Sequence, residues 1–441
     1  MAVGTWKSET IRIGQTGLLV LFWVSALLRA QGPASIDPAK AGAAFAEAQQ
    51  MSAKDSGRLW GKPLYGPMLF VQPATRAAVA NEADAGGVLH QEGNVYVGTL
   101  PKDVVVANTA VEWGGKRWTM VMWPLPENSQ PRDRLLAHEL FHRLQPDLGI
   151  PYANPENAQL DTLEGRMWLQ LEWRALAAAL AESGVAQTQA IRDVLSFAAH
   201  RHELFAGSAE TERTLTLNEG LAEYTGVAAS APDAASGRWR IITRLTSPEA
   251  DTFVRSFAYA SGPAYGLLLD ERLPGWRLRI KSTPDVTVLL AGTVPHSAAV
   301  AVEQRALVYG GAALRIAETE RDVRTQAERA RYRKLLVDGP TLTLPDAGKF
   351  NYSFDPNEVV TLPGFGMVFP TTQVSDEWGT ADVPEGGALL ATDRHSLRIA
   401  APASAPHGTG HVTGPGWALD LAAGWRMVPM EKAGSFTLQK Q

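Results

Sequence analysis

The sequence predicts an α+β protein that ends in a further β-rich module. Three observations support this prediction. Short β-type runs lie between residues 68 and 123, helical periodicity dominates from 129 to 336, and a Gly- and Pro-rich β-like texture follows Gly339. Strands followed by helices are typical of an α+β core, and a second block of strands indicates an appended module. We therefore expect a β-rich part over 33–125, a helical part over 126–338 and a separate β-domain over 340–441.

The first part begins with an Ala-rich segment, 33–60, that we expect to form a lead-in helix. It ends before the Gly and Pro residues of GKPLYGP. Apolar and β-branched runs separated by turn residues then predict the strands of a twisted sheet. These runs are MLFVQ (68–72), NVYVGTL (94–100), DVVVANTA (103–110) and KRWTMVMWPL (116–125).

Helical signals begin at Ser129, which can cap a helix whose first turn accommodates Pro131. Apolar residues then recur at helical spacing until Pro146 and Gly149 end the run. Further helices are expected over 156–183, 187–205, 209–224 (closed by Gly226), near 264–269 and through 301–336.

Composition limits the class of protein. A chain of 441 residues is long enough for two or three domains, and 45% hydrophobic residues can bury a large core. The net charge is −5 and no long basic run is present, which argues against nucleic acid as a partner. Cysteine is absent, so disulfides, thiolate nucleophiles and Cys-based metal sites are excluded.

The N-terminal residues resemble an export signal. Lys7 and Arg12 precede the apolar run Leu18–Leu28, which is too short to span a bilayer and suits the apolar region of a signal peptide. We expect a signal peptide over 1–30, export to the periplasm or the medium, and no stable membrane insertion after cleavage. The alternative is an uncleaved anchor.

The chemistry is concentrated in the motif His138-Glu139-Leu140-Phe141-His142. Residues i and i+4 lie one above the other on a helix, so both imidazoles can reach one Zn²⁺. Glu139 is adjacent to the first ligand and can take a proton from the water that zinc activates. The alternative is a surface helix with two solvated histidines.

Catalytic zinc requires a third protein ligand and one open position. The segment Asn218–Tyr224 (NEGLAEY) offers Glu219 and Glu223, which are again i and i+4 on a helix. One of them can bind the metal while the other hydrogen-bonds a ligating histidine. Glu164 is a rival carboxylate nearer in sequence, since 21 residues separate it from His142 and 76 separate His142 from Glu219, but no acidic residue follows Glu164 four positions later.

The HExxH motif and NEGLAEY together resemble the gluzincin metallopeptidases, the clan of thermolysin and the zinc aminopeptidases. The resemblance covers about 115–270 and implies a thermolysin-like core, a mixed β-sheet followed by a helical bundle. It also implies that Glu219 is the third ligand and Glu223 a supporting carboxylate. Aminopeptidases of this clan carry a YxxG segment, similar to Tyr259–Gly262 here, which implies that the Tyr259 phenol binds the oxyanion. Tyr224 and Tyr265 are competing phenols.

The chain departs from the clan in two respects. The gap between HExxH and Glu219 contains two additional expected helices, and the GxMEN motif that reads a substrate amine is missing. Endo- and exopeptidase action therefore both remain open. The sequence predicts a zinc metallopeptidase with one Zn²⁺ per chain, a peptide or protein substrate and Glu139 as general base. The alternatives are an exported binding protein that retains the peptidase fold and a zinc hydrolase that cleaves a non-peptide bond.

Overall fold

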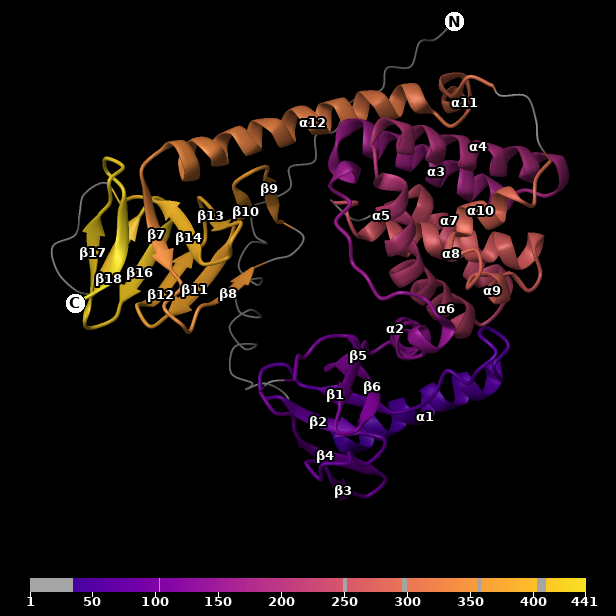
Figure 1. The fold of residues 1–441 in the computed structure, drawn as a ribbon, viewed down its shortest axis with the longest axis horizontal. Helices are drawn as coiled ribbons and strands as arrows, with labels where there is room; N and C mark the ends of the chain where they lie inside the picture. Colours follow the sequence, from indigo (N-terminus) through magenta and orange to yellow (C-terminus); the bar gives the residue numbers. More distant parts are fainter. Residues whose placement is uncertain (1–34, 103, 249–251, 296–299, 355–357, 403–409) are drawn as a thin grey trace, which may run out of the picture. The chain divides into compact units, whose positions relative to one another are not determined.

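The computed structural model describes residues 35–102, 104–248, 252–295, 300–354, 358–402 and 410–441. The chain forms two compact units that divide between Leu144 and Gln145, inside the helical part predicted over 126–338. Its helices and sheets confirm the α+β class (Figure 1). The predicted signal peptide lies outside the described residues. Among the described helices, none is both long and apolar enough to cross a membrane.

The first unit contains a six-stranded sheet of order β3-β4-β2-β1-β6-β5. β1 and β6 run parallel, and the other neighbouring strands run antiparallel. The elements are α1 (Pro38–Asp55), β1 (Met68–Val71), β2 (Ala77–Ala80), β3 (His90–Glu92), β4 (Val95–Thr99), β5 (Thr109–Trp113), β6 (Lys116–Met122) and α2 (Ser129–Leu144).

The strand expected over 103–110 begins only at Thr109. The carbonyl of Val104 accepts a hydrogen bond from the Arg76 guanidinium (2.5 Å) and not from a neighbouring strand. The side chain of Arg76 thus takes an acceptor that a strand would offer to its neighbour, and the pattern of valines does not reveal this.

The core of the first unit fixes α2, the helix that contains the HExxH motif. β1 is buried on both faces, with the Phe70 ring stacked 4.5 Å from Phe45 of α1. α2 packs on β5 and β6, and the fully buried Phe141 lies 5.0 Å from Trp60, measured between ring centroids. Phe141 lies within the motif itself, so the same turn that presents the histidines anchors the helix.

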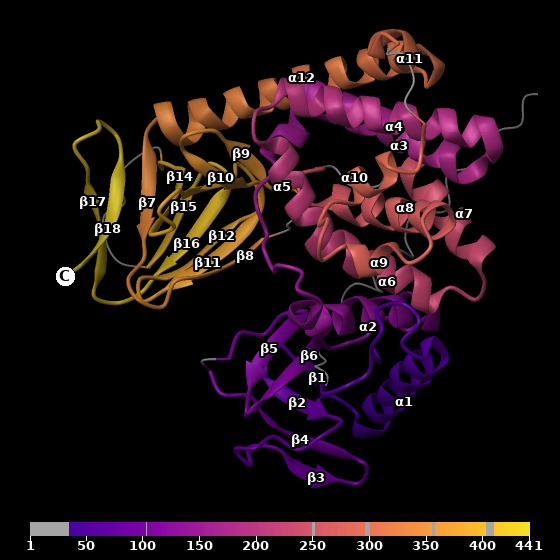
Figure 2. The ribbon, with the colours of Figure 1, turned by 45° about the vertical axis from the view of Figure 1, so that its right-hand side comes forward.

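The second unit begins with helices. α3 and α4 pack closely along each other (Figures 1 and 2). The elements are η1 (Gln145–Leu148), η2 (Ala158–Asp161), α3 (Leu163–Ala181), α4 (Gly184–Leu204), α5 (Ser208–Leu215), η3 (Thr216–Gly220), α6 (Leu221–Ser230), α7 (Ala234–Thr246), α8 (Ser256–Arg272), α9 (Trp276–Arg279), α10 (Val286–Ala291), α11 (Val302–Val308), α12 (Gly311–Arg333) and η4 (Lys334–Asp338).

Several predicted helices differ from the structure: the one expected through 301–336 is α11, α12 and η4, and the one over 156–183 is η2 followed by α3. The helix expected over 209–224 is α5, the π-helical turn η3 and α6, and it continues past Gly226 to Ser230. Gly226 has no positive φ, so it does not terminate the helix.

The second unit ends in two packed β-sheets, which confirms the predicted C-terminal β-rich region. One sheet has the order β17-β18-β7-β14-β13-β10-β9 and the other β15-β16-β12-β11-β8. Residues of both sheets, among them Leu397 and Leu419, share one buried core with Trp378. The strands are β7 (Thr341–Pro345), β8 (Asn351–Phe354), β9 (Val360–Leu362), β10 (Gly366–Phe369), β11 (Thr372–Asp376), β12 (Gly379–Val383), β13 (Ala388–Ala391), β14 (Ser396–Ala400), β15 (His411–Gly414), β16 (Trp417–Leu421), β17 (Trp425–Pro429) and β18 (Phe436–Lys440).

Candidate metal centre

The first part of the candidate site lies on α2. His138, Glu139 and His142 are all buried, at 6%, 4% and 3% exposure. The two Nε2 atoms of the histidines lie 3.2 Å apart. Two nitrogens at the usual Zn–N distance of about 2.0–2.1 Å and a tetrahedral angle would be about 3.3 Å apart. The spacing of the two imidazoles therefore fits one zinc ion held between them.

The C-terminal end of α2 is held by two arginines. Arg143 donates from Nη2 to the Leu64 carbonyl (2.8 Å), and Arg117 donates from Nε to the carbonyl of Arg143 (3.2 Å). Both contacts lie one turn or less beyond His142. A cation at a helix C-terminus also complements the partial negative charge there. The two histidines are thus presented by a helix whose end is fixed.

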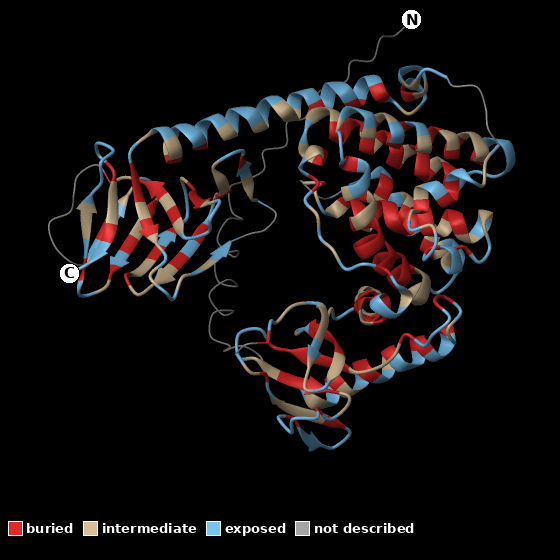
Figure 3. Cartoon of the chain, viewed as in Figure 1, coloured by how far each residue is buried: buried red, intermediate tan, exposed pale blue. Residues whose placement is uncertain are grey.

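The second part lies on η3, which contains Glu219. The stretch from Leu215 to Val227 is buried throughout (Figure 3). Within it, η3 is a π-helical turn of five residues that follows α5. π turns within helices occur frequently at functional sites. Glu219 is 3% exposed. A buried carboxylate requires positive or hydrogen-bonding partners, and this one has several.

Glu219 is contacted by Tyr259 of α8 and by Arg255, the N-cap residue of α8. The Tyr259 hydroxyl donates to Glu219 Oε2 (2.5 Å), and Arg255 donates from Nη2 to Oε1 (2.7 Å). Burial and the adjacent Glu219 carboxylate raise the pKa of the Tyr259 phenol above its ordinary value. Tyr259 therefore keeps its proton at neutral pH and remains a donor.

A pair of glycines explains why Tyr259 reaches Glu219. A Cβ on Gly262 would lie 2.2 Å from the Cα of Gly220, so α8 and η3 touch backbone to backbone there. Gly262 is one turn after Tyr259, and Gly220 directly follows Glu219. The glycine of the YxxG segment thus has a steric role: it allows the close approach that brings the phenol to the carboxylate.

The competing tyrosines have other partners. Tyr224 donates to Asp270 (2.7 Å to Oδ2), and Tyr265 donates to Glu172 (2.9 Å). The rival carboxylate Glu164 accepts hydrogen bonds from Trp168 Nε1 (3.0 Å) and from Arg315 (2.7 Å), with a side chain 39% exposed. An exposed surface ion pair is a plain structural role for Glu164.

Glu223 is buried one helical turn beyond Glu219. Its Oε1 accepts a hydrogen bond from Arg244 Nη1 of α7 at 3.1 Å. The predicted role of Glu223 beside a ligating histidine stays a prediction.

A chain of hydrogen-bonded amide side chains in the second unit adjoins Glu219. Gln145, the residue that follows α2, is fully buried and donates from Nε2 to Asn218 Oδ1 (2.9 Å). Asn218 in turn donates to Asn154 Oδ1 (2.9 Å), which also accepts from Arg255 Nη1 (2.9 Å).

Sequence reasoning missed Gln145, Asn154 and Arg255. The one available signal was the spacing of Arg255 and Tyr259, because residues i and i+4 share a helix face. Gln145 begins the 3-10 helix η1 and Asn154 lies in a loop, and nothing in the sequence distinguishes either from a solvated side chain.

Three buried side chains within the described part of the chain offer ligand atoms that could hold a metal ion: His138, His142 and Glu219. Two imidazoles and one carboxylate are a donor set typical of catalytic zinc. The chain matches no protein-family model, no curated protein and no solved structure.

Proposed function

We propose that the chain is a zinc-dependent metallopeptidase in which His138, His142 and Glu219 hold one Zn²⁺, with a thermolysin-like core. The observation that carries the proposal is the 3.2 Å separation of the two buried Nε2 atoms, with Glu139 between the histidines in sequence. Two solvated surface histidines, the alternative for this motif, would be exposed. Both rings are buried, and a metal ion bound between their Nε2 atoms would stabilise them there.

Hydrogen bonds around Glu219 support its assignment as the third ligand. Gln145 follows α2 directly and hydrogen-bonds Asn218, which precedes Glu219 in sequence. The Arg255 and Tyr259 contacts to Glu219 support an oriented carboxylate. Outer contacts of this kind commonly orient metal ligands.

When bound, Zn²⁺ would polarise the scissile carbonyl and lower the pKa of water. In this proposal Glu139 accepts the proton of the attacking water and delivers it to the departing amine as the C–N bond breaks. The Tyr259 phenol donates a hydrogen bond to the oxygen that gains negative charge. The charged start and short apolar run near the N-terminus support action after export.

Metal analysis and a peptide digest test the proposal. Purified protein should contain about one zinc per chain, and His138→Ala and His142→Ala should lose it, because each removes a neutral imidazole ligand. His395→Ala is the matched control, since His395 has a side chain 77% exposed and should not affect zinc content.

Wild-type protein should cleave a mixed peptide library, and a chelator should stop the cleavage. Protein that neither contains zinc nor takes it up would contradict the proposal. Zinc-loaded protein that cleaves no peptide would favour a binding protein or a hydrolase for another bond.

A further inference from the structure

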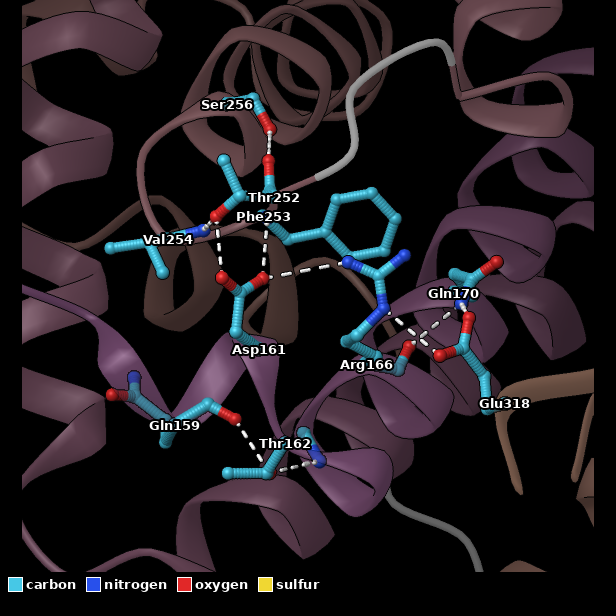
Figure 4. A network of polar contacts seen from close by, with 11 residues as sticks. Gln159, Asp161, Thr162, Arg166, Gln170, Thr252, Phe253, Val254, Ser256 and Glu318 are labelled. Carbon is cyan, nitrogen blue, oxygen red and sulfur yellow. Dashed lines mark hydrogen bonds and ion pairs between the residues drawn. The ribbon is translucent and has the colours of Figure 1, made fainter. Parts of the chain in front are cut away.

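One carboxylate, that of Asp161 in η2, holds the residues just before α8 through hydrogen bonds (Figure 4). Asp161 Oδ2 accepts a hydrogen bond from the Thr252 hydroxyl (2.6 Å), and Oδ1 accepts one from the Phe253 amide (3.0 Å). Two donors from consecutive residues fix both the position and the direction of this segment. Asp161 and Thr252 are 91 positions apart in sequence, so their hydrogen bond is a tertiary contact.

Packing reinforces the same segment. Phe253 is 1% exposed, and its ring lies 4.8 Å from the Trp173 ring, measured between centroids. The Arg166 guanidinium lies 3.7 Å from the centroid of the Phe253 ring, and its Nη1 is 3.5 Å from Asp161 Oδ1. This cation–π contact adds to the attraction that holds the Phe253 ring in place.

Arg166 is itself held from α12. Its Nε donates to Glu318 Oε2 (2.9 Å), and Gln170 donates to Glu318 Oε1 (2.6 Å). Glu318 is 6% exposed and Arg166 is 5% exposed. Arg166 therefore lies between two carboxylates, one of which holds the segment before α8.

The segment that Asp161 holds leads directly to Arg255 and Tyr259, which hydrogen-bond Glu219. The Ser256 hydroxyl donates back to the Thr252 carbonyl (2.6 Å), which joins the first residue of α8 to the segment that Asp161 holds. Arg255 follows Phe253 by two residues, and Tyr259 is one turn further along α8. Both contact the Glu219 carboxylate, through different oxygens.

We propose that Asp161 is a positioning residue for the metal ligand Glu219, acting through Thr252, Phe253 and the Arg255 side chain. The proposal rests on the proposed function, since it takes Glu219 to be the ligand. Asp161 touches neither metal nor substrate; it sets where α8 begins and so where the Arg255 guanidinium meets the carboxylate.

Zinc affinity, measured by competition with a chelator, tests the proposal. Asp161→Asn should weaken zinc binding by about tenfold, the lower range for residues that orient metal ligands. Thr252→Val removes only the hydroxyl donor and should also weaken it, whereas Thr252→Ser keeps the donor and should restore wild-type affinity. With zinc saturating, Asp161→Asn should lower kcat and leave KM unchanged.

A second buried carboxylate provides the matched control. Asp193 is 1% exposed and accepts hydrogen bonds from Arg305 (2.8 Å from Nε) and Tyr309 (2.8 Å) on α11 and the residue after it. Asp193→Asn should lower the Tm without changing zinc affinity. An equal loss of zinc in Asp193→Asn and Asp161→Asn would mean that general destabilisation causes the effect, and would overturn the proposal.

Amide hydrogen exchange of residues 252–260 in zinc-free protein separates this proposal from the proposed function. Asp161→Asn should speed exchange there, whether or not zinc binds the wild type. Unchanged exchange would overturn the positioning role, whereas a wild type that binds no zinc would overturn the proposed function instead.

Discussion

The Tyr259 hydroxyl and Glu219 Oε2 are joined by a hydrogen bond of 2.5 Å, with Arg255 on the other carboxylate oxygen. Burial and the carboxylate raise the pKa of the phenol, which therefore stays protonated. Tyr259 is thus placed to donate, first to the proposed ligand and, in the proposed reaction, to a developing oxyanion.

Tyr259→Phe separates these two roles. If the phenol binds the oxyanion, kcat should fall by about 10²–10³-fold while zinc stays bound, because one hydrogen bond to the transition state is lost. Steady-state kinetics with zinc saturating measures this. Unchanged kcat with weakened zinc affinity would mean that Tyr259 only orients Glu219.

Glu219→Gln should release zinc far more readily than Glu164→Gln, because a neutral amide is a poorer zinc ligand than a carboxylate. Glu164 is a matched control, since it lies on a helix and hydrogen-bonds Trp168 and Arg315. Zinc content after dialysis against a weak chelator measures the difference. The reverse order of zinc loss would make Glu164 the ligand.

Gly262→Ala should destabilise the protein and weaken zinc binding together. The new Cβ would lie 2.2 Å from the Gly220 Cα, and overpacking of this kind costs about 1–3 kcal/mol or more. Gly42→Ala is the control: it lies in α1, and its new Cβ would meet Val95 Cγ1 at an ordinary 3.6 Å. Thermal unfolding of both variants checks this, and equal Tm values would contradict the close approach of α8 and η3.

Stability should fall in acid because of Glu212. The buried Arg201 pairs with Glu172 and with Glu212, each at 2.7 Å. Burial alone would raise the pKa of Glu212, but the Arg201 charge and hydrogen bonds from His202 and Arg201 hold that pKa at about 2. A lowered carboxyl pKa contributes stability above the unfolded value of about 4.3, and this contribution is lost as pH falls toward about 2.

Glu212→Gln should therefore lower the free energy of unfolding at neutral pH and reduce its decline between about pH 4.3 and pH 2. Denaturant titrations across this range measure the slope. The control is Glu203→Gln, whose side chain is 79% exposed. A slope that is the same in wild type and Glu212→Gln would show that the ion pair does not control acid stability.

Much of the fold follows from periodicity. α2 ends at Leu144, two residues before Pro146, where the sequence predicts a stop. The π turn at Thr216–Gly220 could not be predicted, because it accompanies a tertiary contact between Gly220 and Gly262 rather than a local propensity. The late start of β5 likewise depends on Arg76, which is far from it in sequence.

The candidate site likewise combines residues that the sequence identifies with contacts that it does not reveal. A short helical motif specifies His138, Glu139 and His142, so the sequence alone identifies them. The contacts of Glu219 with Arg255, and of Thr252 with Asp161, join segments 36 and 91 positions apart. No local pattern encodes such contacts, so only the folded chain reveals them.

Glu139→Gln tests the central claim most directly. The variant keeps nearly the same shape and leaves His138, His142 and Glu219 in place, so it should fold and retain one zinc per chain. It should lose peptide hydrolysis by several orders of magnitude, because an amide cannot accept the proton of the attacking water. The measurement is cleavage of a peptide library by zinc-loaded wild type and variant, side by side, with a chelator control. Equal cleavage by the two proteins would contradict Glu139 as general base, and with it the mechanism proposed for this site.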